Sequence, residues 1–458
     1  MSMIKSLHWD ITKNCNLRCK HCYNAEKYFN VNSSVYMEKE MNLEQCINTV
    51  ECFSKAGFKH IHFLGGEPLA SPHLFDVIRR AKDFNMVVTI NSNACLLSED
   101  IQQKLIDIGV DQFAASLDGC TELINDSIRG EGTFKKVVSN MMQLNERKRI
   151  CGSKLETALV FTLTKKNLND LILLPSLADK VGVDLIVLTT FIESGQGKKN
   201  HDMFQIDFNT ICDSIDKMVS DELTKHRIPL QIDMRPRFCE YLSEVYNAPV
   251  IYNPKNSLCC AGEDVWYLEA NGNVHPCLAF QLDAGKKALQ DEVYKMETIN
   301  INSKGLEDVK NSQYWISFLQ AKHDFTTERI STCEGCRYTD RCQPCFLDYR
   351  SIDSSIMECE WVKQKEFALY GKIMNASIKL NDEVYFDFKK RTILKAGEPV
   401  LILDSDISYL IWGLINEKKT PKEIVKKLLK EYDVDELLLQ YDVAMFFLTL
   451  KQNGIIRY

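Results

Sequence analysis

The sequence has no apolar stretch that reaches the roughly 20 residues of a membrane-spanning helix, and its start lacks the basic and apolar segments of a secretion signal. It also has no long basic tract, because the net charge is −7 and charges of both signs are interspersed. A protein that binds nucleic acid usually carries a basic footprint, so this charge disfavours such a partner. We therefore expect a cytoplasmic protein that binds neither a membrane nor nucleic acid.

Cysteine, in contrast, is abundant, with 18 residues in a chain of 458. This number is too large for disulfides in a reducing compartment, so clustered cysteines indicate metal ligands. A solitary cysteine is more typical of a small buried core residue. Seven cysteines are solitary in the sequence, namely Cys46, Cys52, Cys95, Cys120, Cys151, Cys212 and Cys239. The other 11 fall into clusters.

The first cluster is the segment Cys15-Asn-Leu-Arg-Cys19-Lys-His-Cys22-Tyr23. Thiolates are the ligands that iron–sulfur clusters and zinc prefer, and a short loop allows three of them to converge. Zinc needs a fourth ligand, for which His21 is the local candidate. A [4Fe–4S] cluster held by three thiolates leaves one iron free to bind another molecule.

The first 200 residues alternate between short apolar runs and helix-length segments. Such alternation predicts a parallel sheet that curls into a partial (β/α)6 barrel of the TIM type, with its active site at the strand C-termini. We expect strands at 4–11, 58–64, 87–90, 112–116, 158–163 and 185–190. Asn42 to Gln45 predicts a capped helix start, and Ser71-Pro72 predicts another. Residues 201–257 show little periodicity beyond one helix near 205–222.

Glycine and polar residues follow the second, third and fourth of these strands. Gly65-Gly66-Glu67-Pro68 ends the second strand, where missing side chains let backbone approach a ligand and a carboxylate accepts an ammonium group. Asn91-Ser-Asn93 and Ser116-Leu-Asp118-Gly119 end the next two, and Arg129 follows. Each segment is also compatible with an ordinary turn before a capped helix.

The loop of Cys15, Cys19 and Cys22, followed by an aromatic residue, resembles the signature of the radical S-adenosylmethionine (SAM) family. The resemblance implies a [4Fe–4S] cluster whose free iron binds SAM and supplies an electron that cleaves it to a 5′-deoxyadenosyl radical. It also implies contacts to SAM from the strand ends. The implied SAM-binding residues are Gly65, Gly66, Glu67, Asn91, Asn93, Ser116 and Arg129. Asn93 stands where many relatives carry glycine.

A second cysteine array begins at Cys259-Cys260, before a probable hairpin with its turn at Asn271-Gly272. Its spacing resembles the SPASM extension, which carries two auxiliary [4Fe–4S] clusters and usually accompanies peptide-modifying enzymes. The implied inner cluster uses Cys260 or Cys259, with Cys277 and Cys345, and the implied outer cluster uses Cys333, Cys336, Cys342 and Cys359. Because the neighbouring Cys259 and Cys260 rarely both reach one cluster, the inner set implies an open iron site. Leu278 replaces the acidic residue of sulfatase-maturating enzymes, which argues against that activity.

The last segment, 376–458, contains no cysteine, and its 13 basic and 13 acidic residues leave it neutral. Three predicted strands at 384–388, 391–394 and 400–403 precede three predicted helices, the second with a capping box at Thr420 and Glu423. This order predicts an α+β winged-helix-like domain, and its neutral charge disfavours DNA. It resembles the PqqD-like recognition element, which binds the leader of a precursor peptide as an added strand.

We therefore expect four segments: a barrel (1–200), a connecting region (201–257), an auxiliary-cluster domain (258–372) and a PqqD-like domain (376–458). The resemblance implies a radical SAM maturase that links residues of a ribosomally synthesised precursor peptide by a thioether or carbon–carbon bond. An electron donor such as flavodoxin or ferredoxin is its further implied partner. A peptide epimerase and a protein oxidase are alternative enzymes. An iron–sulfur sensor that binds through a winged helix is an alternative of another class.

Overall fold

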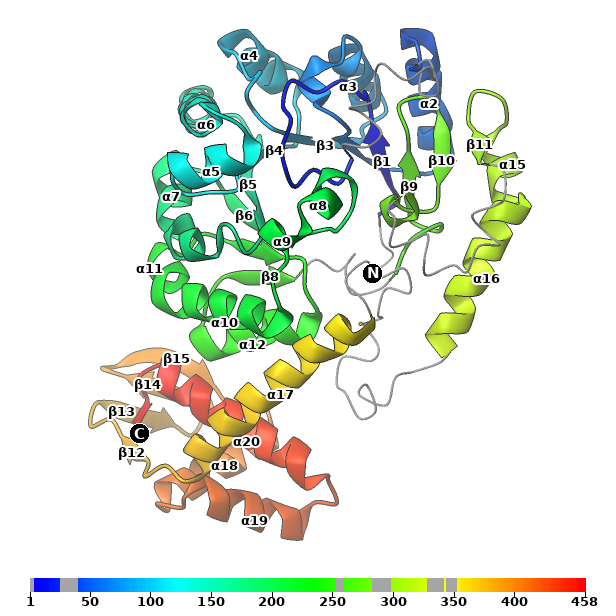
Figure 1. The fold of residues 1–458 in the computed structure, drawn as a ribbon. Helices are drawn as coiled ribbons and strands as arrows, with labels where there is room; N and C mark the ends of the chain where they lie inside the picture. The colour runs from blue at the N-terminus through cyan, green and yellow to red at the C-terminus, as the bar shows by residue number, and fades with distance from the viewer. Residues whose placement is uncertain (1–3, 25–39, 253–258, 282–297, 328–341, 343–351) are drawn as a thin grey trace. The chain divides into compact units, whose positions relative to one another are not determined.

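The computed structural model describes residues 4–24, 40–252, 259–281, 298–327, 342 and 352–458. The chain divides into two compact units (Figure 1). The first contains residues 1–240 and 248–359, and the second contains residues 241–247 and 360–458. The second unit therefore includes all of the neutral, cysteine-free segment.

The first unit is built on one sheet in which strands β1 to β8 are parallel and pair in sequence order. The first six are β1 (Ser6–Asp10), β2 (His60–Leu64), β3 (Val87–Ser92), β4 (Gln112–Ser116), β5 (Glu156–Leu163) and β6 (Leu185–Thr190). These match the six strands expected from the sequence. Their parallel order confirms the partial barrel.

The connecting region contributes two further parallel strands that the sequence pattern does not reveal. They are β7 (Leu230–Ile232) and β8 (Val250–Tyr252), which extend the sheet beyond β6. The one expected helix, near 205–222, corresponds to α10 (Phe208–Met218) and the π-helix η3 (Val219–Leu223). The short helices α9 (His201–Phe204) and α11 (Thr224–His226) lie on either side of it, and α12 (Pro236–Tyr246) follows β7. Strands of three residues are too short to produce a recognisable alternation, which explains why they are missed.

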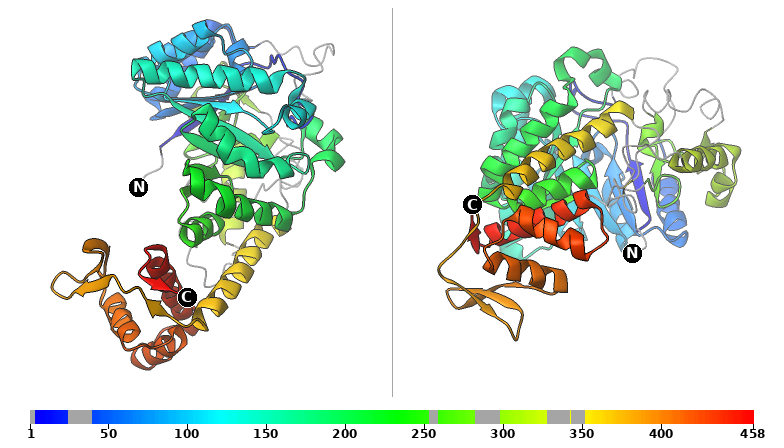
Figure 2. Two further views of the ribbon diagram at one scale, coloured as in Figure 1. Left: turned by 90° about the vertical axis from the view of Figure 1, so that its left-hand side faces the viewer. Right: turned by 90° about the horizontal axis from the view of Figure 1, so that it is seen from below.

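Helices cover the outer side of the strands (Figures 1 and 2). They include α2 (Leu43–Lys55), α3 (Leu74–Asp83), α4 (Glu99–Ile108), α5 (Glu122–Arg129), α6 (Thr133–Cys151) and α7 (Leu174–Val181). The capping box of Asn42 and Gln45 at α2 is confirmed. The expected cap at Ser71 is wrong, because Ser71 Oγ accepts a hydrogen bond from His73 N inside a turn and α3 begins afterwards. No helix in the described ranges is long and apolar enough to cross a membrane.

The segment with the second cysteine array continues the same sheet on its other edge. Strand β9 (Val265–Leu268) pairs in parallel with β1, and β10 (Asn273–His275) and β11 (Ile299–Asn300) follow as antiparallel neighbours. The predicted turn is confirmed, with Gly272 at φ 94°. The Tyr267 hydroxyl on β9 donates a hydrogen bond to the Asp10 carboxylate on β1. The array is therefore joined to the first barrel strand through both backbone and side chains.

A cluster of aromatic rings fixes β9 against the outer helices. Trp266 is almost fully buried and lies 5.8 Å from Phe53 of α2 and 4.2 Å from Trp315, measured between ring centroids. Trp315 belongs to α16 (Gln313–Thr327) and donates its indole N–H to the Gly262 carbonyl at 3.0 Å. Buried aromatic side chains contribute large apolar areas, so this cluster holds the array segment on the barrel.

The second unit contains three antiparallel strands and three helices, in the order that the sequence predicts. They are β13 (Val384–Asp387), β14 (Thr392–Lys395), β15 (Glu398–Ile402), α18 (Asp406–Asn416), α19 (Pro421–Glu431) and α20 (Glu436–Gln452). A further pair, β12 (Lys379–Leu380) and β16 (Ile456–Arg457), joins the two ends of the segment. The capping box of Thr420 and Glu423 is confirmed.

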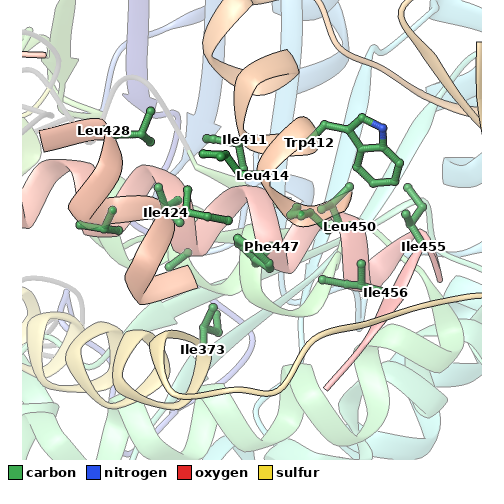
Figure 3. Close-up of a cluster of buried hydrophobic side chains, with 14 of the residues drawn as sticks. Ile373, Ile411, Trp412, Leu414, Ile424, Leu428, Phe447, Leu450, Ile455 and Ile456 are labelled. Atoms are coloured by element: carbon green, nitrogen blue, oxygen red, sulfur yellow. The ribbon is translucent and has the colours of Figure 1, made fainter. Parts of the chain in front are cut away.

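One apolar core holds the second unit together (Figure 3). Ile411 and Leu414 of α18, Ile424 of α19 and Phe447 of α20 are buried in it. Ile373, near the end of the long helix α17 (Ile352–Met374), packs into the same core. The buried residues of each helix recur at helical spacing, which places them on one inward face.

Candidate functional site

The cysteine loop follows β1 directly and lies against the Gly65-Gly66 segment that ends β2. Gly66 N donates to the Thr12 carbonyl at 2.9 Å, and Glu67 N donates to the Asn14 carbonyl at 2.7 Å. A Cβ atom on Gly66 would lie only 2.3 Å from the Asn14 carbonyl oxygen, and Gly65 has φ 127°. The two glycines are therefore required by the approach of the cysteine loop itself.

Cys15, Cys19 and Cys22 are partly exposed cysteines of this loop. Leu17 N donates to Cys15 Sγ at 3.5 Å, and the Asn93 side-chain amide lies 3.9 Å from the same sulfur. Burial raises the pKa of Cys19 to about 12 and also raises that of Cys15, so binding a metal must displace protons from these thiols. In the described ranges no three His, Cys, Asp or Glu side chains are arranged around a single ion. Three soft donors on one short loop fit a cluster, which spreads its ligands over separate irons.

The carboxylate of Glu67 is completely buried and is engaged by the protein. Its Oε1 accepts hydrogen bonds from Ser92 Oγ at 2.6 Å and Leu69 N at 3.0 Å, and its Oε2 accepts one from Asn93 N at 2.7 Å. Burial raises its pKa, although these donors oppose the shift. The side chain therefore joins the ends of β2 and β3, and the expectation that it accepts an ammonium group of SAM stays a prediction.

The other residues expected to bind SAM lie at neighbouring strand and helix ends. Asn91 is the second-to-last residue of β3, and Ser116 is the last residue of β4. Asn93 lies just after β3 and donates from Nδ2 to Asn16 Oδ1 in the cysteine loop at 2.8 Å. Arg129 is the last residue of α5, and its carbonyl lies 4.0 Å from Cys19 Sγ. The structure thus brings Asn93 and Arg129 into contact with the loop, and their contacts to SAM stay predictions.

The side chain of His21, which lies between Cys19 and Cys22 in the loop, turns toward Asp118 just beyond β4. Its Nε2 lies 2.9 Å from Asp118 Oδ2, and Arg129 Nε lies 2.6 Å from the same oxygen. Burial opposes ionisation of Asp118, but Arg129 and His21 outweigh it and hold the pKa of Asp118 well below its usual range. The contact of His21 with the buried Asp118 therefore ties the cysteine loop to the barrel.

The sequence analysis overlooked a segment after β6 that contacts the same loop. Gln196 N donates to the Cys22 carbonyl at 2.9 Å, and Asn200 Nδ2 donates to the Lys20 carbonyl at 2.9 Å. A Cβ atom on Gly195 would lie 2.5 Å from the Tyr23 carbonyl oxygen. The signal for this contact was present as Gly-Gln-Gly shortly after a predicted strand, which indicates a close backbone approach.

Part of the second cysteine array is also described. Cys260 is buried, and its carbonyl accepts hydrogen bonds from the turn that leads into β9. Gly262 N donates to the Pro276 carbonyl at 2.9 Å, so the segments of Cys260 and Cys277 lie side by side. Burial raises the pKa of Cys259, which Lys322 opposes. Cys333, Cys336 and Cys345 lie outside the described residues, whereas Cys342 and Cys359 lie within them and are partly exposed. Both auxiliary ligand sets therefore stay predictions.

Comparison with known families gives three matches in the predicted order. Residues 9–174 match the radical SAM superfamily, residues 259–337 match an iron–sulfur cluster-binding domain (SPASM), and residues 405–456 match coenzyme PQQ synthesis protein D (PqqD). These matches confirm the resemblances found in the sequence.

Curated relatives are similar to this chain over only part of its length. Pre-heme d1 synthase of Dinoroseobacter shibae is 29% identical over 42% of this chain and 45% of its own length. AdoMet-dependent heme synthase of Methanosarcina barkeri is 23% identical over 59% and 75%. Mycofactocin maturase MftC of Mycobacterium tuberculosis is 26% identical over 42% and 46%. The chain thus spans about half the length of two of these three relatives.

Solved structures show the same fold at low sequence identity. Streptococcus suis SuiB bound to its precursor peptide SuiA has a TM-score of 0.55 at 17% identity, covering 76% of this chain and 73% of that one. Native anSMEcpe with bound AdoMet has a TM-score of 0.56 at 15% identity, covering 79% of this chain and 97% of that one. These likenesses support the barrel followed by a cysteine-rich segment.

Proposed function

We propose that this chain, a radical SAM enzyme with SPASM and PqqD domains, modifies a ribosomally synthesised precursor peptide. The observation that carries the proposal is the PqqD match, which falls in a compact unit separate from the barrel. A radical-generating barrel needs no such unit to cleave SAM. A unit devoted to recognition is useful when the substrate is long enough to be held at one place and modified at another.

Its cofactors are SAM and [4Fe–4S] clusters, with Cys15, Cys19 and Cys22 proposed to hold the cluster that binds SAM. When bound and reduced, this cluster supplies the electron that converts SAM to a 5′-deoxyadenosyl radical. The chain's own part is to hold the loop in place. Glu67 fixes the adjoining strand ends, and Asp118 fixes the loop through His21.

The residues proposed to bind SAM are Gly65, Gly66, Glu67, Asn91, Asn93, Ser116 and Arg129. Of these, Arg129 offers a buried positive charge beside the cysteine loop, where it opposes the rise in the pKa of Cys19. A guanidinium group suits a carboxylate, which SAM carries. The auxiliary clusters are proposed to use Cys259 or Cys260 with Cys277 and Cys345, and Cys333 with Cys336, Cys342 and Cys359.

The proposed product is a thioether or carbon–carbon link within the peptide. Hydrogen abstraction leaves a radical on the substrate residue, and closing the link requires the loss of a further electron and proton. An auxiliary cluster is a suitable acceptor for that electron, and a flavodoxin or ferredoxin is the proposed donor for the first reduction. Each link therefore removes two hydrogens from the peptide, about 2 mass units.

The leader is proposed to add as a strand to the small sheet of the second unit. In the described chain, β13 and β15 each pair on one side only, with β14 between them. Tyr385 and Phe388, at and just beyond β13, and Ile402 of β15 expose more than half of their side chains. An edge strand with exposed apolar side chains offers both the backbone hydrogen bonds and the contacts that strand addition uses.

The test uses the full chain with reconstituted clusters, SAM and dithionite. Synthetic peptides are made from short reading frames encoded beside the gene for this chain. We expect 5′-deoxyadenosine formation and a peptide lighter by about 2 mass units for each link. Cleavage of SAM with no change in any such peptide would overturn peptide modification.

A tetrapyrrole enzyme is the second candidate, because two of the relatives are named as synthases of heme or pre-heme d1. The same assay with a porphyrin in place of the peptide separates the candidates. A porphyrin product without a peptide product would favour this alternative.

An epimerized peptide of unchanged mass would identify an epimerase, and absence of SAM cleavage would favour the sensor.

A further inference from the structure

Asp118 joins three elements around the cysteine loop through one buried carboxylate. Its side chain has no solvent exposure, although it carries a charge. Oδ1 accepts a hydrogen bond from Thr162 N on β5 at 2.8 Å, and Oδ2 pairs with both His21 and Arg129. Buried carboxylates are expensive unless they are paired, so this residue requires an explanation beyond packing.

The inner nitrogen of the guanidinium group makes the close approach to Asp118. Arg129 Nε lies 2.6 Å from Asp118 Oδ2 in a buried ion pair that lacks hydrogen-bond alignment, and no hydrogen bond from the two terminal nitrogens reaches any residue in the described part of the chain. A guanidinium held at Nε keeps its planar pair of terminal groups available for a second anion. Such a pair matches the two oxygens of a carboxylate.

Arg129 is also held at the cysteine loop by its backbone. Lys20 N in the loop donates to the Ile128 carbonyl at 2.9 Å, and Cys19 Sγ lies 4.0 Å from the Arg129 carbonyl. The end of α5 and the loop are therefore in direct contact. A second anion bound by Arg129 is thus next to the proposed cluster.

We propose that Asp118 is a positioning residue for SAM, which holds Arg129 at Nε and the cysteine loop at His21 so that the terminal nitrogens of Arg129 bind the SAM carboxylate. This inference rests on the proposed function and assigns a part to a residue that does not itself touch SAM. It requires that Asp118 and Arg129 act as one unit.

The chemistry of the contacts explains why asparagine cannot replace Asp118. If the asparagine oxygen accepts from Thr162, its amide group faces the two donors of His21 and Arg129. If the amide is reversed, the bond to Thr162 is lost. In both orientations Arg129 loses its counter-charge and is no longer held in its position.

The experiment measures the dissociation constant of SAM for the reconstituted, unreduced protein by equilibrium dialysis, so that turnover is not involved. The variants are Asp118→Asn, Arg129→Gln and the double variant. We expect each single variant to weaken SAM binding about tenfold or more, as the loss of a charged hydrogen bond predicts. Because the two residues act as a unit, the double variant is expected to bind SAM no more weakly than Arg129→Gln alone.

Asp170→Asn is the matched control. Asp170 is also a buried carboxylate near the end of β4, and its Oδ2 accepts hydrogen bonds from Cys120 N and Thr121 N, but it forms no ion pair among the described residues. We expect this variant to lower the melting temperature and leave the SAM dissociation constant and the iron content unchanged.

Additive losses in the double variant, or an unchanged dissociation constant in Asp118→Asn, would show that Asp118 is only structural. If Asp118→Asn does not retain its clusters, the SAM dissociation constant of Arg129→Lys tests the inference instead. A lysine keeps the charge, but one ammonium group cannot pair with Asp118 and also hold both carboxylate oxygens, so binding must weaken about tenfold. Wild-type affinity in Arg129→Lys overturns the inference, and failure of the wild type to bind SAM overturns the proposed function as well.

Discussion

The Glu67 carboxylate and the Asn93 backbone are joined by a hydrogen bond of 2.7 Å from N to Oε2. Glu67 ends the Gly-Gly-Glu segment after β2, and Asn93 follows β3, so the bond fixes the spacing of two neighbouring strand ends. Asn93 in turn donates to Asn16 in the cysteine loop at 2.8 Å. Glu67 therefore supports the loop through Asn93.

The first prediction concerns Glu67→Gln. The amide nitrogen of glutamine cannot accept a hydrogen bond, so one of the three buried donors around Glu67 is left unpaired. We expect a loss of about 1–3 kcal/mol in the free energy of unfolding, measured by denaturant unfolding of the chain without clusters. Glu146→Gln, at an exposed carboxylate paired with Arg149, is the control with unchanged stability. Equal stability of the two variants would contradict this account.

The second prediction concerns the three thiols of the cysteine loop. Replacing Cys15, Cys19 and Cys22 with alanine should abolish 5′-deoxyadenosine formation on reduction while auxiliary iron stays bound. The control is Cys52→Ala, because Cys52 is exposed and lies outside both arrays. Liquid chromatography of the reaction products measures the outcome. SAM cleavage that persists in the triple variant would disprove the role of the loop.

The third prediction is the iron content of the reconstituted protein. Three [4Fe–4S] clusters correspond to about 12 irons per chain. Iron and zinc per chain are measured together by elemental mass spectrometry. About four irons with stoichiometric zinc would instead show that the second array is a structural zinc site.

The fourth prediction concerns leader binding by the second unit. Strand addition depends on backbone hydrogen bonds and apolar contacts, so affinity should change little with salt. Fluorescence anisotropy of labelled leader peptides with the full chain, at low and high salt, measures it. A variant with charge at the sheet edge, Tyr385→Asp, should weaken binding, while Leu123→Asp, at an exposed leucine of α5, should not. Binding of duplex DNA that is lost at high salt would favour the sensor.

The fifth prediction concerns the acid stability conferred by Asp184. Burial opposes its ionisation, but hydrogen bonds from Lys148 and Thr157 N outweigh it, so the pKa of Asp184 lies below its ordinary value of 3.8. The stabilisation is therefore present above pH 3.8 and is lost as the pH falls through the lower, folded-state pKa. Asp184→Asn should reduce stability at neutral pH and approach the wild type in strong acid, measured by urea unfolding across pH. A constant difference at all pH values would contradict the assignment.

The sequence by itself determined the features that depend on near neighbours in the chain. The spacing of Cys15, Cys19 and Cys22 identifies the loop, because three thiols so close together have few other uses. The capping boxes at Asn42 and Thr420 are also found correctly, since each needs only a partner three residues away. Apolar periodicity likewise gives the six barrel strands.

Only the tertiary structure decided which distant residues meet. His21 pairs with Asp118, Gly195 approaches Tyr23, and Tyr267 bonds to Asp10 at a separation of 257 residues. The alternation of a strand reveals which side chains share a face, but not which strand lies beside it. The position of β9 next to β1 is therefore set by packing, through the burial of Trp266 against α2 and α16. Hydrogen bonds and ion pairs around the loop form only after that packing has placed their partners within reach.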